Sequence, residues 1–195
     1  MPLSDPAPRK PLHKRAIECR GYRRDDGLWD IEAHMTDTKS YVLANRHRGD
    51  IEPGEPLHDM WLRLTVDENF VVRGAEAVTD AGPFALCPAI TPRFAMLEGL
   101  QIGSGWMRKV REVVGGVNGC THLVELLGPM ATVAYQTIRS SREKTADDGA
   151  SKTKPAYLDR CHALASDGAV VRENFPEWYT GDEYQAAGRG SVFGG

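Results

Sequence analysis

Long apolar runs, a strong charge of one sign and paired cysteines are all lacking in this sequence of 195 residues. No run approaches the ~20 apolar residues that a transmembrane helix needs, and the first residues hold no apolar signal-peptide core. The formal net charge of −3 provides no whole-molecule attraction to nucleic acid. We therefore expect a protein of the cytoplasm that binds neither a membrane nor a nucleic acid.

The four cysteines, none of which forms a CxxC pair, are Cys19, Cys87, Cys120 and Cys161. In a chain of this size without a secretory signal, an even number of cysteines does not by itself indicate disulfide bonds. We expect reduced thiols, which are either buried, metal-bound or reactive. Cys19 and Cys161 are predicted to be structural.

What the sequence does contain is an ordinary balance of side chains, 41% hydrophobic and 26% charged, which suits one domain with a sizeable core. Residues 1–12, with four prolines, are predicted to be a flexible arm, and residues 13–143 a single domain. Residues 144–195 are predicted to form a linker, a short helix at 157–165 and an irregular tail. Aromatic side chains of that tail are expected to dock on the domain or to make a homo-oligomer contact; they are Phe175, Trp178, Tyr179, Tyr184 and Phe193.

Period-2 alternation predicts an antiparallel β-meander in the first half of the domain. Residues 28–37 alternate apolar and polar side chains, residues 58–67 do so again, and residues 70–79 are predicted to be the return strand. Residues 14–24 are predicted to form an exposed strand, and residues 39–45 a second short one.

Three helices are predicted after the meander, at residues 94–100, 106–114 and 121–142. The last of them carries apolar residues at helical spacing. Pro129 in its interior is expected to kink or break it, because proline removes one backbone donor. The predicted fold class is therefore α+β, an antiparallel β-meander packed against C-terminal helices.

A glycine-rich turn places Cys120 and His122 at the start of the longest predicted helix, and two chemistries fit this arrangement. In the first, one carboxylate, two thiolates and one imidazole bind zinc or an iron–sulfur cluster. These metal-ligand candidates are Asp80, Cys87, Cys120 and His122. In the second, Cys120 near a helix N-terminus is a nucleophile, with His122 or His58 as its base.

Structural roles stay open for the same residues. Cys87 and Cys120 can be small apolar core residues, and His122 can simply form a local hydrogen bond. His58, on the apolar face of its predicted strand, is more often a core histidine than a ligand at such a position.

A basic cluster on the predicted strand 14–24 is a further candidate site. Guanidinium groups bind phosphates and carboxylates in a forked geometry, so the cluster is predicted to bind an anion. A solvated face is the alternative. The arginines singled out are Arg20, Arg23 and Arg24.

The run from residue 58 to residue 139 resembles the iron–sulfur cluster scaffold proteins of the IscU and NifU type. The resemblance rests on a meander at 62–67 and 72–76, on Cys87 as a loop cysteine, and on Cys120 as a late cysteine at the start of a long helix. It implies a scaffold-like fold and a non-enzymatic role in binding zinc or an iron–sulfur cluster.

Over about residues 13–140 the chain resembles a bacterial family that carries only a domain-of-unknown-function label. The matching runs are YRRDDGLWDIEAH at 22–34, GEPLHDMWLRLTVD at 54–67 and GCTHLVELL at 119–127. The resemblance implies a setting in bacteria that degrade aromatic acids and coenzyme A thioesters.

We therefore expect a small cytosolic enzyme of aromatic-acid or acyl-CoA catabolism, with thioester hydrolysis as the leading reaction. Its substrate is expected to be a small molecule such as a CoA thioester, and its Cys/His/Asp site is a candidate for zinc. One alternative is a non-enzymatic zinc or iron–sulfur scaffold. A second alternative is a protein-interaction module in which the cysteines only pack.

Overall fold

The computed structural model describes residues 3–143 and 153–181. The chain divides into two units, Met1–Ala146 and Asp147–Gly195. The first unit holds the sheet, the long helix and every candidate site residue named above.

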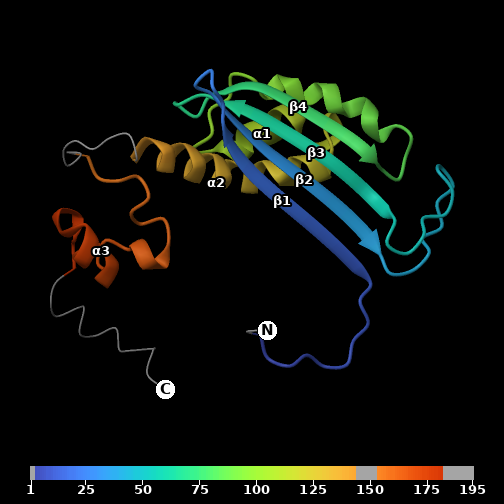
Figure 1. The fold of residues 1–195 in the computed structure, drawn as a ribbon, viewed down its shortest axis with the longest axis horizontal. Helices are drawn as coiled ribbons and strands as arrows, with labels where there is room; N and C mark the ends of the chain where they lie inside the picture. The colour runs from blue at the N-terminus through green and yellow to red at the C-terminus, as the bar shows by residue number, and fades with distance from the viewer. Residues whose placement is uncertain (1–2, 144–152, 182–195) are drawn as a thin grey trace. The chain divides into compact units, whose positions relative to one another are not determined.

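Four antiparallel strands form the sheet of the first unit, in the order β1-β2-β3-β4 (Figure 1). Their bounds are His13–Arg23 for β1, Trp29–Lys39 for β2, Pro56–Val66 for β3 and Val72–Ala81 for β4. The predicted meander is thus confirmed. The short strand predicted at 39–45 is wrong, because that segment makes only an isolated bridge between Leu43 and Ile51.

The two faces of the sheet differ in polarity, as the period-2 alternation predicts. The inner face of β2 and β3 is apolar over most of its length and forms the core with the helices. Its members are Trp29, Ile31, Ala33, Met35, Met60, Leu62, Leu64 and Val66.

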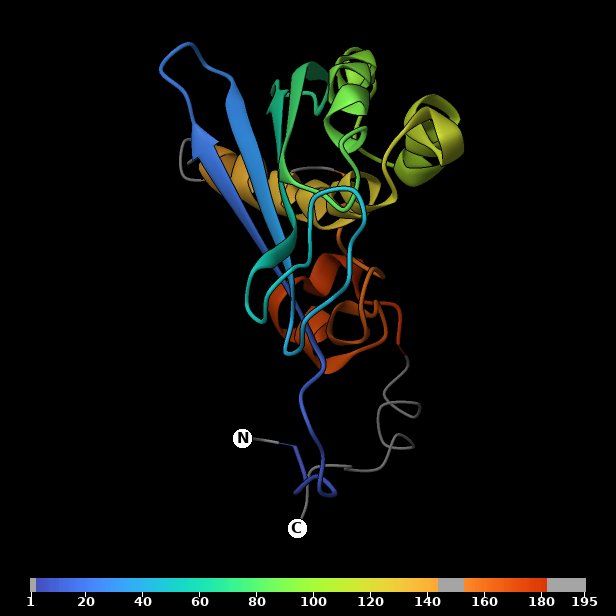
Figure 2. The same ribbon diagram turned by 90° about the vertical axis from the view of Figure 1, so that its right-hand side faces the viewer.

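All the helices of the first unit follow the sheet. They are the 3-10 helices η1 (Cys87–Leu97) and η2 (Gly116–Asn118) and the α-helices α1 (Trp106–Val114) and α2 (Thr121–Glu143). Helix α2 packs across β1, β2 and β3, and these four helices of the first unit lie on one side of the sheet (Figures 1 and 2). The fold class is therefore α+β, with the sheet packed against C-terminal helices.

Two helix predictions need correction. The helix predicted at 94–100 is a longer 3-10 segment that begins at Cys87. Helix α2 continues through Pro129 without a break, because apolar side chains on both sides of the proline are buried in the same core. Among the described helices, none is long and apolar enough to cross a membrane.

Strand β1 lies against α2 at a point where only glycine fits. A Cβ atom added to Gly21 would lie 2.9 Å from Thr137 Cβ and even closer to its hydroxyl oxygen. Because Gly21 has no side chain, the strand and the helix can approach each other closely here. This close approach brings the remainder of β1 onto the helix surface.

The second unit has little regular structure in its described part, residues 153–181. The helix predicted at 157–165 is wrong, since only the three-residue 3-10 helix η3 (His162–Leu164) forms there. A short α3 (Ala169–Asn174) and η4 (Pro176–Trp178) follow. Of the predicted aromatic tail, Tyr184 and Phe193 lie outside the described residues.

The close approach of β1 to α2 generates a prediction about stability. Gly21→Ala should lower the free energy of unfolding by about 1–3 kcal/mol, because an overpacked contact must be relieved by backbone shifts. The matched control is Gly74→Ala in β4, where an added Cβ meets nothing closer than 3.8 Å. The control should be neutral or stabilising by up to about 1 kcal/mol. Urea denaturation measures both, and equal effects would rule out the tight contact.

Candidate functional site

A carboxylate lies on the apolar face of the sheet, at the end where β1 begins. Asp37 continues the row of inward-facing residues on β2 and is only 1% exposed. The β2–β3 pairing shifts register directly after it, between Asp37 and Thr38. Such bulges often re-aim side chains beside functional sites, and a buried charge requires partners.

Four contacts surround the Asp37 carboxylate, of which three are hydrogen bonds and the fourth is a close approach of His13. Oδ1 contacts Arg15 Nε at 2.9 Å and His13 Nε2 at 3.1 Å, and Oδ2 contacts Arg15 Nη2 at 2.8 Å and His58 Nδ1 at 2.9 Å. Burial raises the pKa of Asp37, but the hydrogen bonds from Arg15 and His58 outweigh it and lower that pKa to about 2. Asp37 is therefore ionised at neutral pH.

Arg15 ties three elements together. While its forked contact holds Asp37 on β2, its Nη1 atom donates a hydrogen bond to Glu125 Oε2 on α2. The register pairs Arg15 directly with Asp37 across β1 and β2, so both side chains point toward the helix. The first strand, the second strand and the start of α2 thus meet at one guanidinium.

His58 is oriented by the same carboxylate. An ionised carboxylate only accepts hydrogen bonds, so His58 Nδ1 must carry the proton that points to Asp37. Burial lowers the pKa of His58, the neighbouring His122 lowers it further, and the bond to Asp37 raises it. The pKa lies below its ordinary value, which leaves His58 neutral at pH 7, with Nε2 as an open acceptor.

His122 packs against His58 at a tilt and contacts Cys120. The ring centroids of the two histidines are 3.8 Å apart with a 37° tilt. His122 Nδ1 lies 3.9 Å from Cys120 Sγ. Burial, followed by the charge of Arg15, lowers the pKa of His122. A chain of contacts therefore runs from the thiol through two neutral imidazoles to a buried carboxylate.

Glycines in the turn before α2 allow Cys120 to lie at this position. An added Cβ at Gly119 would overlap the Val114 carbonyl oxygen, and one at Gly115 would overlap that of Arg111. Gly116 has φ +56°, a left-handed conformation that favours glycine. The chain can thus fold back tightly over the end of α1 and start α2 at once, where the Cys120 carbonyl accepts the first helical bond, from Val124 N–H.

A cavity of about 440 Å³ opens on the other side of Cys120. It is formed by the segment that follows β4 and by the turn before α2. The residues that line it are Phe84, Leu86, Cys87, Ala89, Ile90, Val117, Gly119 and Cys120. Cys87 and Cys120, which are distant in sequence, therefore line the same cavity.

The predicted metal ligands are only partly brought together. Cys120 and His122 are in contact and Cys87 shares the cavity, whereas Asp80 lies exposed on β4. Among the described residues, the group whose ligand atoms all lie within 4.8 Å of one another is Asp37, His58 and His122. The sequence therefore anticipated His122 and missed Asp37 in that group.

The predicted anion cluster is not at this site. Arg20 pairs with Glu18 at 2.7 Å, and Arg24 pairs with Asp26 at 2.6 Å in the hairpin turn. Arg23 is eight residues from Arg15, roughly 26 Å along an extended strand. The arginine beside the candidate site is Arg15, which the sequence analysis did not select.

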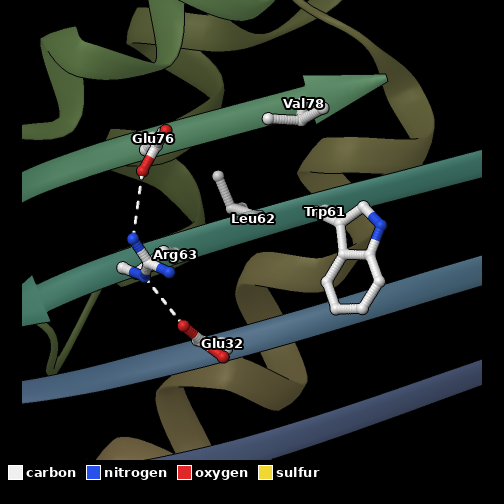
Figure 3. Close-up of a pocket in the computed structure, with 6 residues that line it drawn as sticks. All are labelled: Glu32, Trp61, Leu62, Arg63, Glu76 and Val78. Atoms are coloured by element: carbon white, nitrogen blue, oxygen red, sulfur yellow. Dashed lines mark hydrogen bonds and ion pairs between the residues drawn. The ribbon is translucent and has the colours of Figure 1, made fainter. Parts of the chain in front are cut away.

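The outer face of the sheet carries a second hollow of about 280 Å³ around Trp61 (Figure 3). Arg63 projects from β3 between Glu32 and Glu76 and pairs with both. Trp61 stacks on His34, with ring centroids 3.7 Å apart. Opposite charges neutralise each other across neighbouring strands here, as in ordinary cross-strand pairs, so we assign no site to this face.

Fold and site together define an α+β protein with a buried carboxylate–histidine pair beside a cysteine–histidine pair. The chain belongs to the family described as "Protein of unknown function (DUF2889)", whose model matches residues 13–136. This confirms the resemblance to a family of unknown function. The match begins at the first residue of β1 and contains every residue of the site.

Comparison with curated proteins and with solved structures gave no match. The likeness to IscU and NifU scaffolds therefore rests on the order of sequence features alone. What the chain shares with its own family is the whole sheet and most of α2.

The buried carboxylate generates a prediction about acid stability. Because the pKa of Asp37 is about 2 and that of an unfolded Asp is ~3.9, its stabilisation is complete above about pH 4 and is lost as the pH falls toward 2. The full contribution is about 2.5 kcal/mol. Asp37→Asn should remove this contribution, so the profile of unfolding free energy against pH should be flatter than the wild-type profile between about pH 4 and 2.

Asp80→Asn is the control for this measurement. Asp80 is exposed, so the substitution should change the free energy of unfolding by less than about 0.5 kcal/mol at any pH. An Asp37→Asn profile that stays parallel to the wild-type profile in acid would show that Asp37 does not carry the effect.

Proposed function

We propose that this protein is an acyl-transfer enzyme that hydrolyses thioesters, with Cys120 as nucleophile and His122 as its base. The observation that carries the proposal is the contact of Cys120 Sγ with His122 Nδ1, at 3.9 Å, on the wall of a cavity. A nucleophile beside a base that a third group orients is the general signature of covalent catalysis. The loose contact is of the kind that tightens when substrate binds.

The chemistry balances within these groups. His122 Nδ1 takes the thiol proton while Cys120 sulfur attacks the thioester carbonyl carbon, and the oxyanion formed collapses with loss of the substrate thiolate. That thiolate takes the proton from His122, which leaves an acyl-Cys120. Water then attacks the acyl carbon, gives a proton to His122, and releases a carboxylic acid as the Cys120 sulfur recovers that proton.

The first turn of α2 supports the oxyanion. Helical bonding begins with Val124 N–H, so the N–H groups of Thr121, His122 and Leu123 have no intrahelical acceptor. These donors and the positive end of the helix dipole surround the position of Cys120. Preorganised donors of this kind are worth about 10²–10³ in rate elsewhere.

His58 and Asp37 act as positioning residues. The tilted ring contact, with centroids 3.8 Å apart, restricts the His122 ring, and the hydrogen bond to Asp37 orients His58. When His122 becomes an imidazolium, the buried carboxylate offsets its charge, just as it raises the pKa of His122 against burial. The arrangement shares its logic with the Ser-His-Asp template, in which the carboxylate orients and does not accept the proton.

The test is a panel of acyl-CoA thioesters assayed for thiol release. Cys120→Ser should lower kcat/KM by at least about 10³-fold, because a nucleophile acts as part of a unit with its base. His122→Ala should do the same. The acid limb of the wild-type pH profile should have its midpoint below 6.5, since the pKa of His122 is lowered and the base works only when neutral.

Cys161→Ala is the control, because Cys161 is exposed and belongs to the other unit. It should leave kcat/KM unchanged. If Cys120→Ser and His122→Ala fold normally and both keep an activity found in the panel, the nucleophile proposal is wrong.

A second candidate function is a metal-assisted hydrolase. It is favoured by the close grouping of the ligand atoms of Asp37, His58 and His122. Two neutral imidazoles and a carboxylate suit zinc, which then lowers the pKa of a bound water. Arg15 and His58 donate hydrogen bonds to the two oxygens of Asp37, and His13 Nε2 lies 3.1 Å from Oδ1, so the carboxylate would have to give up one of these contacts to bind an ion. Because of this requirement, the reaction with Cys120 as nucleophile is proposed ahead of the metal-assisted reaction. An IscU-like zinc or cluster scaffold would use Cys87 and Cys120 instead.

Metal analysis separates these candidates. If the second is correct, protein purified and reloaded with zinc should hold about one ion per chain, and His58→Ala or His122→Ala should lose it. Cys87→Ser and Asp80→Asn should keep the zinc. Loss with those two variants would favour the scaffold set, and a wild-type chain that takes up no zinc would exclude both metal versions.

A further inference from the structure

The cavity beside Cys120 is apolar. No Asp, Glu, Lys, Arg or His is among its lining residues, so nothing in it compensates a buried charge. A carboxylate or phosphate placed there would gain no charged partner for whatever hydration it loses. Its volume of about 440 Å³ falls within the range of small-molecule sites.

The walls expose large apolar side chains that the fold itself does not cover. Leu86 is 78% exposed and Val117 is 97% exposed, and Phe84 is 52% exposed. Apolar side chains gathered on one exposed surface mark ligand or partner sites more often than lone ones do. The two walls come from the segment after β4 and from η2, and Cys120 lies between them.

The wall at Phe84 is held in place from outside. The Asn45 side chain donates to the Pro83 carbonyl at 2.9 Å. His47 meets the Phe84 ring edge-on, with centroids 4.9 Å apart. Gly82 also leaves room for Cys87, whose Sγ would lie 3.1 Å from an added Cβ. The hollow is therefore a shaped surface of the fold.

We propose that this cavity binds the uncharged alkyl or aryl part of an acyl group, with the carbonyl carbon presented to Cys120. Cys120 is the residue that the cavity shares with the His122 contact, so a chain lying in the cavity ends at the reactive sulfur. That this acyl group is the substrate's rests on the function proposed above. Uncharged groups such as hexanoyl or benzoyl are selected over succinyl, whose terminal carboxylate has no partner in the cavity.

Alkylation of Cys120 tests the cavity without requiring any catalytic activity. Iodoacetamide and N-hexyl iodoacetamide react by the same step, in which the thiolate displaces iodide, so only the hexyl group differs. The rate at each cysteine is followed by mass spectrometry of peptides. Each buried CH₂ is worth about fourfold in binding, so Cys120 should react at least tenfold faster with the hexyl reagent. Exposed Cys161 should show less than a twofold preference.

Matched variants locate the effect. Leu86→Asp and Val117→Asp change exposed side chains of the cavity wall, and each should abolish the hexyl preference while the iodoacetamide rate stays unchanged. Met96→Asp is the control, since Met96 is 55% exposed on the same η1 segment and is not a lining residue. It should keep the preference.

Equal rates of the two reagents at Cys120 in the folded wild-type chain would overturn the proposal. If Cys120 resists both, binding of N-hexylacetamide decides, through shifts of the Ala89 and Ile90 methyl signals in NMR spectra. Shifts support the cavity and unmoved signals overturn it. A hexyl preference at Cys120 of the wild-type chain, together with a Cys120→Ser variant that still hydrolyses thioesters, would retain the cavity and reject the proposed function.

Discussion

The buried carboxylate of Asp37 is the constraint on which the site depends. An ionised group that is 1% exposed persists only if its surroundings supply donors. Those donors come from the two flanking strands, through Arg15 and His58. Since Arg15 also binds Glu125, the same charge that fixes His58 also ties the start of α2 to the sheet. The same contacts of Asp37 and Arg15 therefore both orient the histidines and dock the helix.

The contacts of Asp37 also bear on the two chemistries that the sequence left open. A carboxylate with both oxygens engaged orients its neighbours well and binds a cation poorly. A guanidinium in bidentate contact opposes a dication at the same oxygens. The imidazoles are different, because His58 Nε2 stays open and His122 meets a thiol. The proposed nucleophile and its base are therefore in contact without rearrangement, whereas a metal at Asp37 would compete with the contacts from Arg15 and His13.

Much of the fold follows from local pattern, and the central pair of the site does not. Alternation predicted the strands, and the glycine-rich turn pointed to Cys120 and His122. Asp37 is the next residue on the apolar face after Met35, so a polar residue continuing a buried row was an available signal. Its pairing with His58 was not available, because it depends on strand register and on a bulge. Arg15 lies on an edge strand whose exposed residues show no apolar periodicity.

The turn before α2 explains why the thiol can serve two environments. Gly115 and Gly119 let the backbone pass against the end of α1 where a side chain would collide with a carbonyl. Cys120 therefore begins the helix beneath the histidine pair while its other side borders the apolar cavity. A longer or bulkier turn would move the Cys120 sulfur away from either the histidine pair or the cavity. Reaction at a carbonyl requires both a base and a bound acyl group near the same atom, so the proposed acyl transfer depends on this tight turn.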